Sequence, residues 1–410
     1  MVRAWSQKPS ALADRVVTET MRLIETIKKR FWVILIGTGL ALSPIHNLWL
    51  TNAATNSQGE VLFFLPALGY LLLIMGAGLF LLYNWDRVKA NGLGDKRIWI
   101  PLLVIVGAIG LSGTAIDGSI QDKIAPLGMG AVLFALYLAA RMLGKELFYP
   151  LAIGAAIGSL GILAHQIVHP GAVTGGFIFE QNFDIATGYI LMGAALFVHR
   201  WRWWLASLAV VALLVSGAPE AVFALGVVGL FGLFRRDWSK RAAPMAAVIG
   251  LLLIVGLATG LLQSAYSYVR ASIMQTPTAH YVSPDGEERL VSPLDMRWLV
   301  IRDAMIDIQP LGIGYGLTNF RPTTVHNVPL IIIQQLGWPG VLAAIAWLWV
   351  TTWCLRKTRW EYAWVAVVAL SVFDHFLWTQ LAPVWWMLIG ASTAGSTLEG
   401  GSDLVFRRAT

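Results

Sequence analysis

Long apolar stretches, separated by short polar segments, follow one another along nearly the whole chain. A helix needs about 20 mostly apolar residues to cross the roughly 30 Å hydrocarbon core of a bilayer. Twelve stretches approach or reach this length, at residues 31–50, 61–84, 98–116, 124–140, 148–168, 185–199, 203–217, 220–234, 242–263, 328–354, 363–380 and 382–396. The pattern predicts an all-α polytopic membrane protein with about 12 transmembrane helices.

The positions of the basic residues predict the orientation of these helices. With the N-terminus inside, 24 of the 30 Lys and Arg fall in cytoplasmic segments, one (Lys123) in a short outer loop and five in a long outer loop, 264–327. Because Lys and Arg in short loops mark the cytoplasmic side, this distribution favours an even number of crossings. It also favours two crossings over a re-entrant pair for the short seventh and eighth stretches, which a turn at 216–219 joins.

The chain is therefore expected to have five parts. They are a basic cytoplasmic segment (1–30), helices 1–9 (31–263), one large outer loop between helices 9 and 10 (264–327), helices 10–12 (328–396) and a cytoplasmic tail (397–410). The first segment is either an amphipathic helix on the inner membrane surface or a simple basic tail.

Composition agrees with this picture and excludes several classes of protein. With 57% hydrophobic and 13% charged residues, the chain is neither disordered nor an ordinary soluble domain. The single cysteine, Cys354, excludes a disulfide scaffold and a Cys-ligated zinc site. The net charge of +7 follows from membrane topology, so membrane lipids and not nucleic acid are the expected partners.

Ionisable residues that the topology does not explain gather on the outer side. They are His46, Asp117, His165, His169, Glu180, Asp184, Glu220, Asp374 and His375. Charged groups near membrane depth are costly and mark functional sites. Because ATP is cytoplasmic, their placement argues against ATP-driven work.

The long outer loop contains five Arg, no Lys and six acidic residues. The Arg residues are Arg270, Arg289, Arg297, Arg302 and Arg321. Arg presents a planar fork that binds phosphate oxygens bidentately. The alternative is that these are ordinary surface ion pairs, such as Arg302 with a neighbouring acid.

Two local motifs occur within this loop. Ser292, Pro293 and Asp295 predict a helix start, and the helix is expected to run to about Ile308, before Pro310. The glycine-rich run 311–316 has neither the spacing nor the preceding strand of a dinucleotide fingerprint. It is either a turn, which we favour, or a nest of backbone N–H groups for an anion.

His326 and Asn327 stand where the tenth apolar stretch begins. Asn327 can cap that helix, with Pro329 in its first turn. His326 then lies directly outside a helix N-terminus, which attracts anions, and a neutral imidazole there can accept a proton. The alternative is a structural histidine.

Asp374 and His375 form an acid–imidazole pair in the outer half of the eleventh stretch. They can orient a catalytic group, line a water-filled cavity or relay protons. Four tryptophans of this region are expected in the interfacial aromatic belt, namely Trp360, Trp378, Trp385 and Trp386.

These residues, taken in order, resemble the signature of the O-antigen ligase and polymerase superfamily. The resemblance lies in Arg297-Trp298, in the run 307–316, and in His326-Asn327 followed by Leu330 and Gly337. It covers about 297–337, with a further similarity at Gln181-Asn182, while the topology is similar over the whole chain.

The resemblance implies an integral-membrane glycosyltransferase of the bacterial inner membrane with its active site facing the periplasm. Such enzymes move a glycan from undecaprenyl pyrophosphate to a hydroxyl with inversion, without a metal or a cofactor. Ligases use the lipid A core as acceptor, polymerases use a second lipid-linked glycan, and related enzymes use protein.

Carried over residue by residue, the resemblance makes His326 the general base and Arg297 a ligand of the pyrophosphate. The segment 216–220 lacks the basic residue that many members have, so Arg270, Arg302 or Arg321 is expected to replace it. Gln335 stands where many members have Glu, and Asp374 is a possible substitute. Asn327 and His375 are expected to support the site.

A transporter of lipid-linked glycans, or a proton-coupled carrier, is the rival of a different class. Twelve spans suit a transporter, but internal repeats and charges at the bilayer midplane are not apparent in the sequence. A membrane assembly scaffold would not explain the gathering of Arg and His on the outer side.

Overall fold

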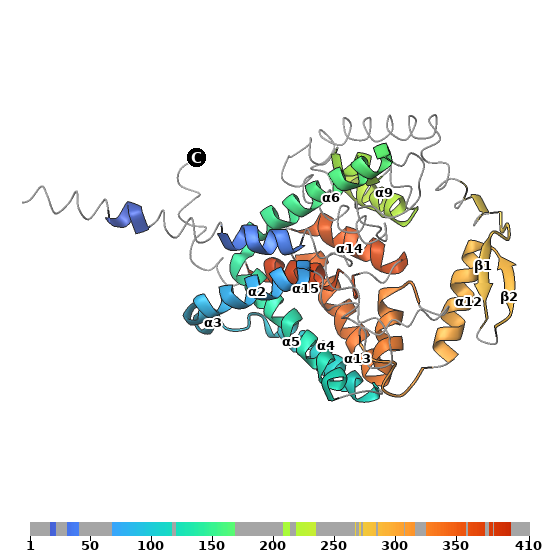
Figure 1. Cartoon of the computed structure of the whole chain (residues 1–410), viewed down its shortest axis with the longest axis horizontal. Helices are drawn as coiled ribbons and strands as arrows, with labels where there is room; N and C mark the ends of the chain where they lie inside the picture. The colour runs from blue at the N-terminus through green and yellow to red at the C-terminus, as the bar shows by residue number, and fades with distance from the viewer. Residues whose placement is uncertain are drawn as a thin grey trace, which may run out of the picture.

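The computed structural model describes residues 17–21, 31–40, 68–116, 120–168, 208–213, 219–234, 267, 270–271, 274–283, 286–306, 308–315, 325–357, 360–373, 377–379 and 381–394. Within these residues the chain is mostly helical (Figure 1). In chain order the labelled elements are α2 (Leu68–Tyr83), α3 (Trp85–Asn91), α4 (Lys96–Ser112), η1 (Gly113–Ala115), α5 (Ile120–Leu143), η2 (Gly144–Leu147), α6 (Phe148–Val168), α9 (Pro219–Phe234), β1 (Ala279–Val282), β2 (Glu288–Val291), α12 (Pro293–Ile306), α13 (Val328–Lys357), α14 (Glu361–Phe373) and α15 (Ala382–Thr393).

Three of these helical segments are long and apolar enough to cross a membrane. They are Lys96–Ala115, Lys123–Leu143 and Val328–Arg356. Shorter apolar helices cover Phe31–Leu40, Leu71–Tyr83 and Glu361–Val372. The protein is thus a membrane-embedded helical protein, as the hydrophobic pattern predicts.

The number of crossings stays a prediction. The stretches expected at 185–199 and 242–263, like most of segment 1–30 and the whole tail 397–410, lie outside the described residues. Of the stretch 203–217, only 208–213 is described, and it is helical.

The core forms where α5 packs against α15 and α13 packs against α4, with α14 against α9 (Figure 1). It is rich in tryptophan, with the side chains of Trp347, Trp364, Trp378, Trp385 and Trp386 fully buried. Trp347 stacks on Trp385, with ring centroids 5.5 Å apart.

The expectation that the tryptophans of this region form an interfacial belt is wrong for Trp378, Trp385 and Trp386. The physical reason is visible for two of them, because a buried indole N–H needs an acceptor. Nε1 of Trp378 donates to Oε1 of Gln335 at 2.8 Å, and Nε1 of Trp385 donates to Oγ1 of Thr351 at 3.2 Å. These partners satisfy the indole N–H groups of Trp378 and Trp385 inside the protein.

The long loop contains strands as well as a helix. β1 and β2 pair antiparallel, with Ala279 opposite Val291 and Val282 opposite Glu288. α12 follows directly and packs against β1 (Figure 1). The loop therefore departs from the all-α expectation, while the apolar segments follow it.

Candidate functional site

The N-terminus of α13 is capped by Asn327, as predicted. Its Oδ1 accepts from the backbone N–H of Leu330 at 3.3 Å, and its carbonyl accepts from the N–H of Ile331 at 2.9 Å. Pro329 occupies the first turn, where the missing N–H costs nothing. The side chain also donates, from Nδ2 to the carbonyl oxygen of Val372 at 3.2 Å.

This second bond ties the start of α13 to the end of α14. Val372 precedes the predicted pair Asp374-His375 by two residues in the chain. Asp374 and His375 themselves lie outside the described residues, and so does Arg321.

His326 lies immediately before this cap, and its side chain is exposed. The preceding residue, Val325, is buried, and its N–H points to Oε1 of Gln334 at 3.5 Å. This contact holds the backbone of Val325 in place, while the imidazole of His326 is exposed. An exposed imidazole beside a helix N-terminus can accept a proton from a bound group.

Substitutions of Asn327 can distinguish the effect of the helix cap on stability from that of the hydrogen bond to Val372 in α14. Asn327→Ala loses both and is expected to lower stability by about 1 kcal/mol, the usual effect of removing an N-cap. Asn327→Ser keeps a capping oxygen but has no Nδ2 to reach Val372. Thermal unfolding in detergent should therefore place Asn327→Ser between wild type and Asn327→Ala, and equal midpoints for the two variants would contradict a stabilising cap.

α13 is not one continuous helix. At Gly337 the backbone turns to φ 65° and ψ −141°, and Pro339 follows. The loop Pro310–Tyr315 docks into this break through three hydrogen bonds. The N–H of Ile313 donates to the carbonyl of Gln334 (3.3 Å), that of Gly314 to Gln335 (3.0 Å) and that of Trp338 to Pro310 (3.0 Å).

These bonds decide between the two interpretations of the glycine-rich run. The N–H of Gly312 donates to the carbonyl of Gln309 at 3.0 Å, and that of Tyr315 donates to Oγ of Ser112 at 3.0 Å. With Ile313 and Gly314 also engaged, four consecutive backbone donors already have protein acceptors. The described part of the run is a docked turn, and these four N–H groups are not available to form an anion nest.

The break also creates a buried polar cluster around Gln335. Its side chain is fully buried, and Oε1 accepts from the indole N–H of Trp378. The ring of Tyr315 meets that of Trp378 edge-on at 5.3 Å. An ionised carboxylate would be costlier here than this amide, because it would have to be buried with a neutral donor as its partner.

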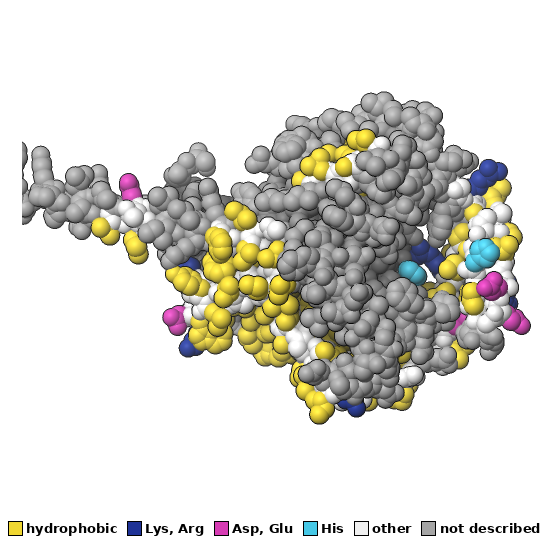
Figure 2. Space-filling model, in the orientation of Figure 1, with side chains coloured by type: hydrophobic (Ala, Val, Ile, Leu, Met, Phe, Trp, Pro, Cys, Tyr) yellow, Lys and Arg dark blue, Asp and Glu magenta, His cyan; other side chains and the backbone are white. Residues whose placement is uncertain are grey.

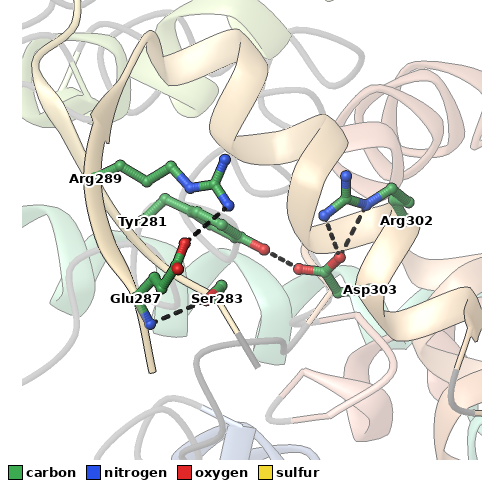
Figure 3. Close-up of polar contacts among 6 residues, drawn as sticks. All are labelled: Tyr281, Ser283, Glu287, Arg289, Arg302 and Asp303. Carbon is green, nitrogen blue, oxygen red and sulfur yellow. Dashed lines mark hydrogen bonds and ion pairs between the residues drawn. The ribbon is translucent and has the colours of Figure 1, made fainter. Parts of the chain in front are cut away.

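The predicted arginines of the long loop have different surroundings. On α12, Nε and Nη2 of Arg302 both donate to Oδ1 of Asp303, at 2.9 and 2.8 Å (Figure 3). This is the ion pair that the sequence left open as an alternative for Arg302. Arg297, on the same helix, is half-buried, while Arg270 is exposed.

Asp303 links the hairpin to α12. The hydroxyl of Tyr281, on β1, donates to Oδ2 of Asp303, and both side chains are buried (Figure 3). Burial raises the pKa of Asp303, but the hydrogen bonds from Tyr281 and Arg302 outweigh it, so the net pKa lies below the ordinary value. Sequence reasoning did not single out this cluster, although two short segments that contain β-branched or aromatic residues, with Pro284 and Gly286 between them in the sequence, form a recognisable hairpin pattern.

The lowered pKa of Asp303 gives the hairpin a defined acid sensitivity. Its ionised form stabilises the folded loop fully above the unfolded pKa of about 4, and this contribution is lost as the pH falls through the lower folded pKa. Hydrogen exchange should show hairpin amides such as that of Tyr281 opening more at pH 3 than at pH 7. In the Asp303→Asn variant these amides should already be less protected at pH 7 and should lose less protection on acidification. If the variant showed the same pH response as the wild type, Asp303 would not be the group that makes the hairpin acid-sensitive.

The structure brings α12 into contact with α13. Figure 2 shows histidine and Lys or Arg side chains beside the lobe formed by α12 and the hairpin. Among the residues that the structure describes, no three His, Cys, Asp or Glu side chains converge as metal ligands would.

No known protein family matches this chain, and a search of curated proteins finds no significant relative.

Proposed function

We propose that this protein is an O-antigen ligase-like glycosyltransferase of the bacterial inner membrane. It moves a glycan from undecaprenyl pyrophosphate to a hydroxyl of the lipid A core on the periplasmic face. The observation that best supports this proposal is the position of His326. Its side chain is exposed directly before the start of α13, which Asn327 caps and which is long enough to cross a membrane. The proposal also uses the contact of α12, which bears Arg297 and Arg302, with α13.

The proposed reaction follows from these groups. A ring nitrogen of His326 takes the proton of the acceptor hydroxyl, whose oxygen attacks the anomeric carbon of the donor glycan. The bond between that carbon and the diphosphate oxygen breaks, and undecaprenyl pyrophosphate departs with the electron pair, leaving the anomeric configuration inverted. Cations and helix N-terminal N–H groups stabilise the charge that develops on the diphosphate.

Arg297 is proposed to hold the diphosphate. Arg297→Lys keeps the charge but loses the planar fork, so the apparent KM for the lipid donor should rise about tenfold or more. Arg289→Lys is the matched control, because Arg289 is an exposed arginine of the same loop whose partner is Glu287, at 3.7 Å. Steady-state kinetics with varied donor measure the effect, and equal KM values for both variants would remove Arg297 from the donor site.

Two experiments test the proposed function. The purified protein in detergent should transfer glycan from the lipid donor to the lipid A core, whereas a transporter needs a sealed membrane and would show no reaction.

Gel analysis of lipopolysaccharide from a deletion strain identifies the acceptor. Loss of core capping supports a ligase, a single repeat unit on the core indicates a polymerase, and an unchanged pattern argues against both.

A further inference from the structure

We propose that the exposed apolar face of α12 lies against the lipid of the outer leaflet and anchors the loop to the membrane. This inference does not depend on the glycosyltransferase proposal. It starts from the side chains that α12 presents to its surroundings.

Four large apolar side chains of α12 are exposed, beside the exposed charged residues Asp295 and Arg302. Leu294, Trp298 and Met305 are 48%, 65% and 43% exposed, and Ile306 is 72% exposed. The first three, at i, i+4 and i+11, form one stripe of a helix. The opposite side of the helix carries Pro293, Val300 and Ala304, all buried. Among the residues that the structure describes, the stripe is therefore part of the exposed side of α12.

The chain itself holds this stripe close to a membrane-embedded helix. α12 ends at Ile306, and only four residues later the carbonyl of Pro310 accepts from the N–H of Trp338, inside the break of α13. Four residues reach at most about 14 Å when fully extended. The C-terminal end of α12 is consequently tethered to a helix that is itself long and apolar enough to cross a bilayer.

The uncovered surface of α13 continues the apolar character of the stripe. Trp338 is 67% exposed, and Leu342, Ile345 and Trp349 further along the helix are also exposed. In a membrane-embedded helix such side chains face lipid. Trp298, in the stripe on α12, is of the residue type that prefers the membrane interface.

The charges of α12 do not account for the proposed contact with the membrane. α12 carries Arg297 and Arg302 against Asp295 and Asp303, so the helix is close to neutral. Arg302 is already paired with Asp303, and Asp295 accepts from the hydroxyl of Ser292. The partner that fits this face is therefore the hydrocarbon and interfacial region of the bilayer. Burial of apolar side chains stabilises the contact, which should depend little on anionic lipid.

A fluorescent label at position 298 tests this contact in the full-length chain. Trp298→Cys is made in a Cys354→Ala background, labelled with an environment-sensitive dye and reconstituted in phosphatidylcholine nanodiscs. Glu288→Cys, at an exposed position of β2, is the control. Lipid-borne doxyl quenchers should quench the label at 298 at least about threefold more than at 288, while aqueous iodide shows the reverse order. Adding phosphatidylglycerol should leave the ratio unchanged.

Two outcomes would overturn the inference. Quenching of position 298 by iodide but not by doxyl lipid would place the face in water, and protection from both quenchers would assign it to a protein partner. Met305→Cys reports on the same stripe if the Trp298 variant does not fold. Because no glycan transfer is measured, failure here leaves the proposed function untouched.

Discussion

Replacing His326 with alanine is expected to abolish glycan transfer almost completely while leaving the protein folded. Removal of a positioned base typically lowers the rate by about 10² to 10⁴, and the proposed mechanism assigns proton removal to His326. Folding should be unaffected because the side chain is exposed and the cap belongs to Asn327. The measurement is kcat with purified enzyme, lipid donor and acceptor.

His280→Ala is the matched control for this variant. His280 is an exposed histidine of β1, within the same loop, and it has no role in the proposed chemistry. Its kcat should equal that of the wild type, and both variants should elute identically on size exclusion. Wild-type turnover by His326→Ala would remove the general base from the mechanism, and loss of activity in both variants would assign the effect to the loop as a whole.

Features that depend on neighbouring residues could be read from the sequence. Ser292 caps α12 as predicted, since the N–H of Asp295 donates to its Oγ at 3.1 Å. α12 ends at Ile306, two residues before the predicted end. Asn327 and Pro329 likewise mark the start of α13. Each signal acts within one helical turn, so no knowledge of the tertiary structure is needed to interpret it.

Features that depend on distant residues could not be read in the same way. The sequence suggests a turn in the glycine-rich run but not its acceptors in α13, because Ile313 and Gln334 are brought together only by the fold. Trp378 shows the same limit: a tryptophan near a membrane surface is usually interfacial, and only its pairing with Gln335 reveals why it is buried. The positions of Asp374, His375 and Arg321 relative to His326 stay predictions.

The break in α13 leads to the second large effect, which concerns Gly337→Ala. A Cβ at Gly337 would overlap the N of Gly312 and the carbonyl oxygens of Pro310 and Gln309. The backbone there has φ 65°, which costs an alanine roughly 1 kcal/mol or more. Relieving the overlap would separate the loop Pro310–Tyr315 from the helix and break three hydrogen bonds, each contributing about 1 kcal/mol.

The expected total for Gly337→Ala is therefore a loss of about 4 kcal/mol in local stability. Hydrogen exchange of the amides of Gly314 and Trp338 should detect it as loss of protection. Gly107→Ala is the control, because a Cβ there meets no atom within 4 Å and alanine favours a helix over glycine. If Gly337→Ala keeps wild-type protection, the loop does not dock into the break. A third outcome is that protection is lost and glycan transfer fails while His326 stays exposed. The docked loop would then be needed to hold the start of α13 in its working position. The reason is that the loop and His326 are both attached to the same nine-residue stretch of α13, Val328–Leu336.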